Sequence, residues 1–253
     1  MISRRSFLVG GIGAVAGLFL GKAPAGSKEG FPQFFLAQLR YRGEDWDPYP
    51  QFPEPIIEEL ELRTSIVADR QRRIVAASDR ELFFCPFLYM AGRYGFDPWS
   101  PEEREALGRY LTFGGFLLAE DTVGARGSGF DAAFRREMMQ IFPRHGLQRL
   151  PLDHSVFQSF YLITTLGGRQ KVNPYLEGVI IDNWTPVIYC QNDLAGAWAR
   201  DKSGRWLQEC TPGGEAQRSS AFRLGVNIIV YSLTGDYKKD LVHHPFIKKR
   251  LGS

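Results

Sequence analysis

Residues 110–121 read YLTFGGFLLAED, and this stretch contains the end of a helix, a turn and a buried strand. Apolar side chains recur at helical spacing up to Leu111, and Gly114-Gly115 ends that pattern because glycine is common just past a helix. Residues 116–119 form a short apolar run, as expected for a strand covered on both faces. Two acidic residues, Glu120 and Asp121, close the strand. A helix leading directly into a buried strand is typical of an α/β sheet.

The same alternation extends in both directions along the chain. The helix before this strand begins at Ser100, which can act as N-cap, with Pro101 at the first helical position and Glu103 completing a capping box. Further helices are predicted over residues 55–63, 134–142 and 215–233, and strands over residues 34–41, 81–90, 178–182 and 186–190.

These elements predict an α/β fold with three layers, a mostly parallel sheet with helices on both faces. The segments 35–41, 82–89, 116–119 and 187–190 should be neighbours in that sheet, because near-continuous apolar runs require cover on both sides. The length suits a single domain.

The first 25 residues have the three parts of a secretory signal. Arg4 and Arg5 form a positive start, an apolar glycine-rich run follows, and Ala23-Pro24-Ala25 is a small-residue cleavage site. The pattern Ser-Arg-Arg-x-Phe-Leu resembles the twin-arginine consensus. We therefore expect a twin-arginine signal peptide over residues 1–25, cleavage after Ala25, a single domain over residues 26–253 and a periplasmic or inner-membrane-associated location. A general secretory signal with two chance arginines is the alternative.

The charge of the chain argues against a nucleic-acid partner. The full chain has 31 Lys and Arg against 28 Asp and Glu, and the predicted signal holds three of the bases and none of the acids. Because the mature chain is balanced, a nucleic-acid-binding protein is not supported. The basic C-terminal tail, Lys238 to Arg250, is a candidate peripheral contact with the inner membrane or with an acidic partner, the alternative being a solvated tail.

Several motifs in order resemble the bacterial family catalogued as domain of unknown function 4159. They are FFLAQLRYRG (34–43), FLYMAG (87–92), YLTFGGFLLAED (110–121), LPLDHSVF (150–157) and LGVNIIVY (224–231). The resemblance covers about residues 31–235 and implies a flavodoxin-like fold similar to that of the class I glutamine amidotransferases. It implies no chemistry, because function belongs to sites and not to folds.

A glutaminase reaction is not expected from the cysteines. The amidotransferase nucleophile sits on a Gly-x-Cys-x-Gly elbow, whose glycines permit a strained turn. Cys85, Cys190 and Cys210 all lack these neighbours, and no serine elbow is present. The odd, sparse set also does not resemble a disulfide framework, and Cys85 and Cys190 are expected to be buried apolar residues.

Polar side chains at predicted strand ends are the remaining candidates for a site. Ligands of open α/β sheets bind outside the carboxyl ends of the strands, and a carboxylate–histidine group there could act as acid and base. In the alternative, Asp121 and Asp193 cap turns or helices and His154 satisfies a backbone group. The spacing carries no metal signature, and no metal or other cofactor is expected. The polar set is Glu120, Asp121, Asp153, His154, Asp182, Asn192 and Asp193, with Tyr89 as a possible wall.

From the sequence we expect an exported binding module for an envelope protein or small ligand, with a binding surface at Tyr89, Asp121, Asp153, His154, Asn192 and Asp193. The alternative is a hydrolase acting on a carbohydrate or amide through Asp121, Asp153 and His154. An enzyme would bring at least two of those side chains together in an open cleft.

Overall fold

The computed structural model describes the backbone of residues 34–251 and the side chains of residues 34–234. The predicted signal, with Arg4, Arg5, Ala23 and Ala25, lies outside the described residues.

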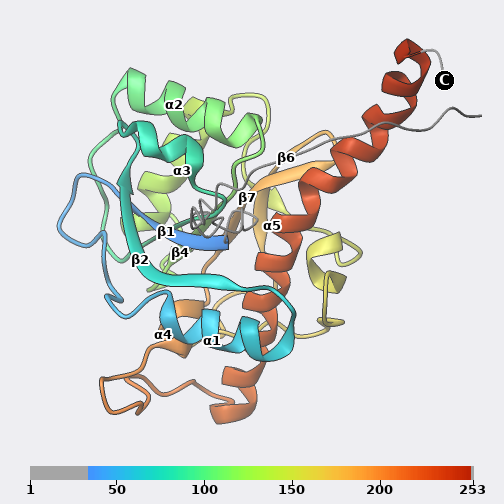
Figure 1. Cartoon of the computed structure of the whole chain (residues 1–253). Coiled ribbons are helices and arrows are strands. Elements are labelled where there is room, and N and C mark those ends of the chain that lie inside the picture. Colours follow the sequence, from blue (N-terminus) through green and yellow to red (C-terminus); the bar gives the residue numbers. More distant parts are fainter. Residues whose placement is uncertain (1–33, 252–253) are drawn as a thin grey trace, which may run out of the picture. The chain divides into compact units, whose positions relative to one another are not determined.

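A seven-stranded sheet forms the centre of the domain, in the order β2-β1-β3-β4-β7-β6-β5 (Figure 1). The strands from β2 to β7 pair in parallel, and β6 and β5 extend the sheet as antiparallel strands. The strands are β1 (Phe34–Arg40), β2 (Ala68–Ala76), β3 (Leu88–Gly92), β4 (Leu117–Asp121), β5 (Gln148–Arg149), β6 (Glu177–Ile181) and β7 (Trp184–Cys190).

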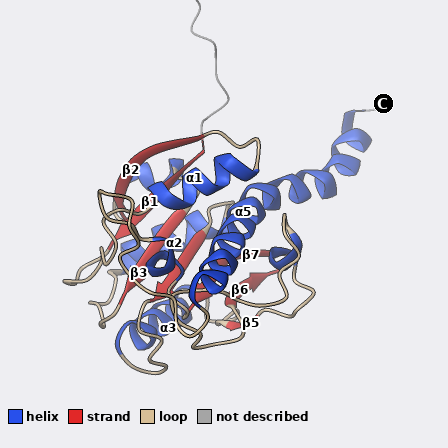
Figure 2. Ribbon diagram, turned by 90° about the horizontal axis from the view of Figure 1, so that it is seen from below, coloured by secondary structure: helices blue, strands red, loops and turns tan. Residues whose placement is uncertain are grey.

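Helices cover both faces of the sheet, which confirms the predicted three-layer α/β fold (Figure 2). One face packs against α1 (Glu54–Arg63), α4 (Leu194–Trp198), α5 (Gly214–Leu251) and the short 3-10 helix η2 (Ser155–Gln158). The other face packs against α2 (Pro101–Thr112), α3 (Gly129–Ile141) and the 3-10 helix η1 (Arg80–Phe84).

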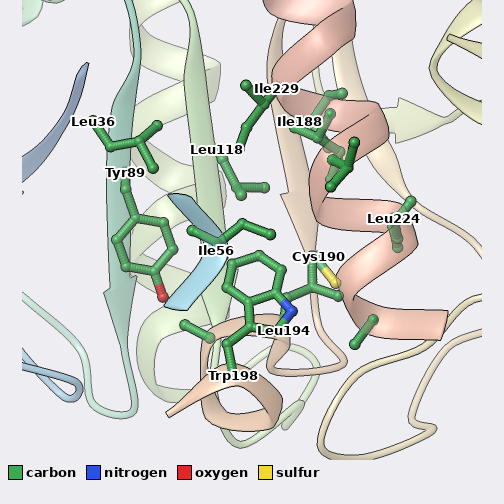
Figure 3. Close-up of a cluster of buried hydrophobic side chains, with 14 of the residues drawn as sticks. Leu36, Ile56, Tyr89, Leu118, Ile188, Cys190, Leu194, Trp198, Leu224 and Ile229 are labelled. Carbon is green, nitrogen blue, oxygen red and sulfur yellow. The ribbon is translucent and has the colours of Figure 1, made fainter. Parts of the chain in front are cut away.

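Successive residues of the central strands point to opposite faces, as the pleat requires. In β4, Leu118 faces the α5 side and its neighbours Leu117 and Ala119 face the α2 side. On the α5 side, Leu118 packs with Ile188 of β7 and with side chains of α5 (Figure 3).

The predicted neighbours in the sheet are confirmed, since β1, β3, β4 and β7 are adjacent and parallel. The predicted capping box is also present: the Ser100 hydroxyl accepts from the Glu103 N–H at 3.2 Å, and the Glu103 carboxylate accepts from the Ser100 N–H at 2.7 Å.

The elements differ from the sequence prediction in several places. The apolar run 81–90 is not one strand, because residues 80–84 form η1 and Pro86, without an N–H, precedes β3. The strand β2 was not predicted because its residues, ADRQRRIVA, are largely charged, as an edge strand tolerates. Helix α5 continues to Leu251, so the predicted tail from Lys238 to Arg250 has a helical backbone.

Candidate functional site

The carboxyl ends of two adjacent parallel strands bring most of the predicted polar residues together. Glu120 and Asp121 end β4, and Asn192 and Asp193 follow the end of its neighbour β7. Each of the four is at most 1% exposed. This edge of the sheet therefore contains a polar network, but one closed to solvent.

Glu120 is held by three donors. The Tyr89 hydroxyl donates to Oε2 at 2.7 Å, and the backbone N–H groups of Leu194 and Ala195 donate at 2.6 and 3.1 Å. Figure 3 shows the Tyr89 ring on the sheet face where Leu194 of α4 lies. Burial and the nearby carboxylate of Asp193 raise the pKa of Glu120 to about 8, against the lowering effect of the donors.

Asp193 joins this cluster from the other strand. Its Oδ2 accepts from the Tyr49 hydroxyl at 2.7 Å and pairs with the Arg169 guanidinium, while Oδ1 accepts from the Gly196 N–H at 3.1 Å and so caps α4. The backbone at Asp193 is left-handed, with φ of 58°, a region that Asp and Asn enter more readily than other non-glycine residues. Burial raises the pKa of Asp193, and the Arg169 charge opposes that rise.

Asn192 holds the loop around Val172 and Asn173 at the same edge through hydrogen bonds. Its Oδ1 accepts from the N–H groups of Val172 and Asn173 at 2.9 and 2.8 Å, and its Nδ2 donates to the Asn173 carbonyl at 2.7 Å. The Oδ1 of Asp121 accepts from the Val123 N–H at 2.9 Å, and its Oδ2 has no hydrogen-bond partner among the described residues. These contacts hold turns and loops in place, and none of them faces an open cleft.

The other three residues of the predicted polar set lie elsewhere. His154 accepts from the Val156 N–H through Nδ1 at 3.2 Å and contacts the Thr185 hydroxyl through Nε2 at 2.9 Å. Thr185 lies at the amino end of β7, roughly 16 Å of strand from the end at Cys190. Asp153 is exposed, and Asp182 forms part of the turn between β6 and β7.

The structure therefore does not bring Asp121, Asp153 and His154 together in one cleft. The sequence reasoning assumed that the loop at 150–157 folds over the carboxyl edge, whereas His154 contacts the opposite end of β7. His154 satisfies a backbone group, and Asp193 caps a helix, as in the structural alternative considered above.

The cysteines are also unsuited to nucleophilic chemistry. All three are free and buried. Burial raises the pKa of Cys85 to about 11 and that of Cys190 well above its usual value, so the thiolate is disfavoured in both.

An open pocket that the sequence analysis missed lies next to the polar network. It has a volume of about 230 Å³ and is bounded by residues between β5 and β6. Asn173, which binds Asn192, is one of its walls, so this side of the pocket lies beside the carboxyl end of β7, whereas the walls Leu152 and Phe157 flank His154. The lining residues are Leu150, Leu152, Phe157, Ile163, Thr164, Thr165, Leu166, Lys171, Asn173, Pro174 and Tyr175.

Exposed apolar side chains occur in the pocket wall and in the chain segment next to it. Leu152 in the wall is 89% exposed, and Leu162, the chain neighbour of a wall residue, is 79% exposed. Phe160 is 44% exposed. The sequence feature that could have indicated this surface is the apolar run over residues 160–163, which belongs to no helix or strand.

Positive charge accompanies this apolar surface. Lys171 lines the pocket, and the Arg149 guanidinium lies 3.7 Å from the ring centroid of Tyr175 in its wall. Within residues 34–234, neither base forms an ion pair with an acidic side chain. The pocket therefore combines an apolar wall with uncompensated cations.

No metal-binding group of three or more His, Cys, Asp or Glu side chains occurs in the part of the chain that the structure describes. None of the described helices is long and apolar enough to cross a membrane.

Comparison with known families matches residues 35–233 to the family described as "Domain of unknown function (DUF4159)". The match covers most of the chain, so the protein belongs to this family. No curated protein matches the sequence.

Proposed function

We propose that this chain is a protein-binding module of the bacterial cell envelope, and that its pocket receives an apolar side chain of a partner beside an acidic one. The observation that carries the proposal is the open pocket between β5 and β6 with its exposed apolar rim.

The size of the pocket favours a side chain over a whole small molecule. Small-molecule sites typically measure about 300–1,000 Å³, and this pocket measures about 230 Å³. Protein interfaces are commonly anchored by one or two apolar or aromatic side chains in pockets of this kind, surrounded by residues that exclude water. Leu152 and Leu162 on the rim would form that surround.

The charge of the pocket specifies the partner further. Lys171 and Arg149 would attract a carboxylate near the anchoring side chain, and opposite charges at a rim favour correct orientation and faster association. A partner segment with a leucine or aromatic residue next to Asp or Glu therefore fits best.

The geometry disfavours the hydrolase alternative. A general base must lie within hydrogen-bond reach of its partner, and His154 and Asp121 belong to opposite ends of the sheet. A relationship to the class I glutamine amidotransferases, if it extends to this chain, would be one of fold alone, because the cysteines are buried with raised pKa values.

The cell-envelope part of the proposal rests on the twin-arginine pattern in residues 1–25. Changing Arg4 and Arg5 together to Lys should leave the full-length precursor in the cytoplasm. Unchanged export of that variant in cells lacking the twin-arginine translocase would contradict it.

Selection from a random peptide display library tests the binding proposal. The chain without residues 1–25 should enrich peptides with an apolar residue next to an acidic one. Leu152→Asp and Lys171→Glu should each weaken the enriched peptides at least tenfold, while Phe113→Asp, at an exposed site on the opposite sheet face, should not. Enriched peptides that bind all three variants equally, or a failure to enrich any, would refute the proposal.

A further inference from the structure

Three exposed phenylalanines lie at the amino-terminal edge of the sheet. Phe83 and Phe84, in η1 just before β3, are 48% and 79% exposed, and Phe113, just before β4, is 81% exposed. Because β3 and β4 are parallel neighbours, the segments that precede them meet at one edge. This edge is opposite to the one that carries the polar network.

The hydroxyl of Tyr110 bridges the two phenylalanine segments. Tyr110 Oη donates to the Cys85 carbonyl at 2.8 Å and accepts from the Phe116 N–H at 3.2 Å. Phe84 precedes Cys85, and Phe113 lies three residues before Phe116. The exposed rings therefore stand on two segments fixed to each other, which we call the phenylalanine edge (Phe83, Phe84 and Phe113).

Cations accompany these rings. The guanidinium of Arg109 lies 5.6 Å from the ring centroid of Phe83, and Arg80, in η1, is exposed. Neither is in an ion pair with a described acidic side chain, although the exposed Glu81 adjoins Arg80 in the chain. Apolar rings beside arginines can enter the interface of a bilayer while the cations reach its headgroups.

The first strand begins at this edge, and the last helix runs toward it. Strand β1, parallel to β3, begins at Phe34. Helix α5 runs toward the same edge: Gln217 near its start donates to the Gly168 carbonyl at 2.7 Å, and the Tyr231 hydroxyl accepts from the Thr185 N–H at the amino end of β7.

The sequence that follows in α5 is basic. Beyond Thr234 it contains Lys238 and Lys239 and then the run 248–250, Lys-Lys-Arg, against two aspartates. Each Lys or Arg near an anionic bilayer surface contributes about 1 kcal/mol to binding, which corresponds to about a fivefold change in affinity.

We propose that the phenylalanine edge is a membrane-docking surface for anionic phospholipid, with the rings entering the interface and the basic end of α5 reaching the headgroups. A bilayer suits this edge because exposed rings and cations outside ion pairs occur together on it, and helix α5 runs toward it with its basic end. The partner-binding pocket lies at the β5–β6 end of the sheet, away from β3 and β4, and so stays open to the aqueous side.

Flotation with vesicles tests this proposal. The chain without residues 1–25, which keeps every described residue, should bind vesicles of phosphatidylglycerol and phosphatidylethanolamine in a 1:3 ratio and not vesicles of phosphatidylcholine. The double variant Phe84→Ser and Phe113→Ser should bind at least tenfold more weakly. The matched control, Leu152→Ser and Leu162→Ser, removes equally exposed apolar residues from the pocket rim and should bind as the unchanged chain does.

Salt and insertion depth give two further measurements. Changing residues 248–250 together to Gln should weaken binding about fivefold for each charge removed, and only at low salt. Because the three native cysteines are buried, an environment-sensitive dye can be attached to a Phe113→Cys variant and, as control, to Leu152→Cys. A fluorescence gain on anionic vesicles at the first position alone is expected. Equal gains at both, or undiminished binding by the double phenylalanine variant, would overturn the proposal.

Discussion

Replacing Glu120 by Gln should remove a steep pH dependence from the folding stability. In the folded protein, burial and the Asp193 carboxylate raise the pKa of Glu120 from about 4.5 to about 8. The folded state therefore holds a proton between these values that the unfolded state has released. The contribution of this bound proton to the free energy of unfolding is fully present below about pH 4.5 and is lost as pH rises toward 8.

The magnitude follows from the pKa difference. Each unit corresponds to about 1.4 kcal/mol, so the free energy of unfolding should fall by about 5 kcal/mol across the window because of this one group. The Glu120→Gln variant has no such loss, but its amide leaves one N–H of α4, at Leu194 or Ala195, without an acceptor, at a cost of about 1–3 kcal/mol.

The two stability curves should therefore cross between about pH 5 and 7, the variant being less stable in acid and more stable near pH 8. Urea unfolding at half-unit steps from pH 4.5 to 8.5 measures both curves. Asp121 adds a slope common to both proteins, whereas Asp193 is coupled to Glu120, so the difference between the curves reports Glu120 together with its effect on Asp193. Curves that stay parallel within about 1 kcal/mol would show that Glu120 is ionised in the folded state throughout.

Two further predictions concern the other residues of the candidate set. Asp193→Asn keeps the helix cap and the left-handed backbone but leaves the Arg169 charge unpaired, and should cost about 3 kcal/mol of unfolding free energy in denaturant titrations. A loss below about 1 kcal/mol would contradict the ion pair. His154→Ala should cost about 1–2 kcal/mol because its contacts to Val156 and Thr185 are lost, whereas the exposed Asp153→Ala should stay within about 0.5 kcal/mol. Equal losses for the two would contradict this assignment.

The parts of the fold that local patterns determine were predictable. The capping box at Ser100 and the apolar run at 116–119 depend on neighbouring residues alone, and both occur as expected. Strand β2 was not predictable in this way, because its charged residues acquire strand structure only by pairing along β1. The prediction of one strand over residues 81–90 was wrong because apolar composition alone does not distinguish a buried strand from a segment with exposed residues such as Phe84.

The candidate site was predictable only in part. The sequence shows that residues 120–121 and 192–193 follow strands, and a parallel sheet must then bring them to one edge. It does not show that Tyr89 donates to Glu120, or that Tyr49 and Arg169 bind Asp193, because these partners come from distant segments of the chain. Burial of the network depends on the loop that Asn192 holds, and that loop also forms the pocket wall.

This last connection links the buried network to the proposed binding surface. Asn192 holds the backbone of Val172 and Asn173, and Asn173 lines the pocket next to Lys171. The buried polar groups at the sheet edge are costly to retain unless they are satisfied, and here they fix the position of the pocket wall. Polar residues at strand ends can therefore indicate a functional surface without forming it, since they shape a neighbouring loop that carries the contacts. In the two proposed interactions, recognition depends on exposed apolar and basic side chains at the pocket and at the phenylalanine edge, and the buried acids stabilise the domain that presents them.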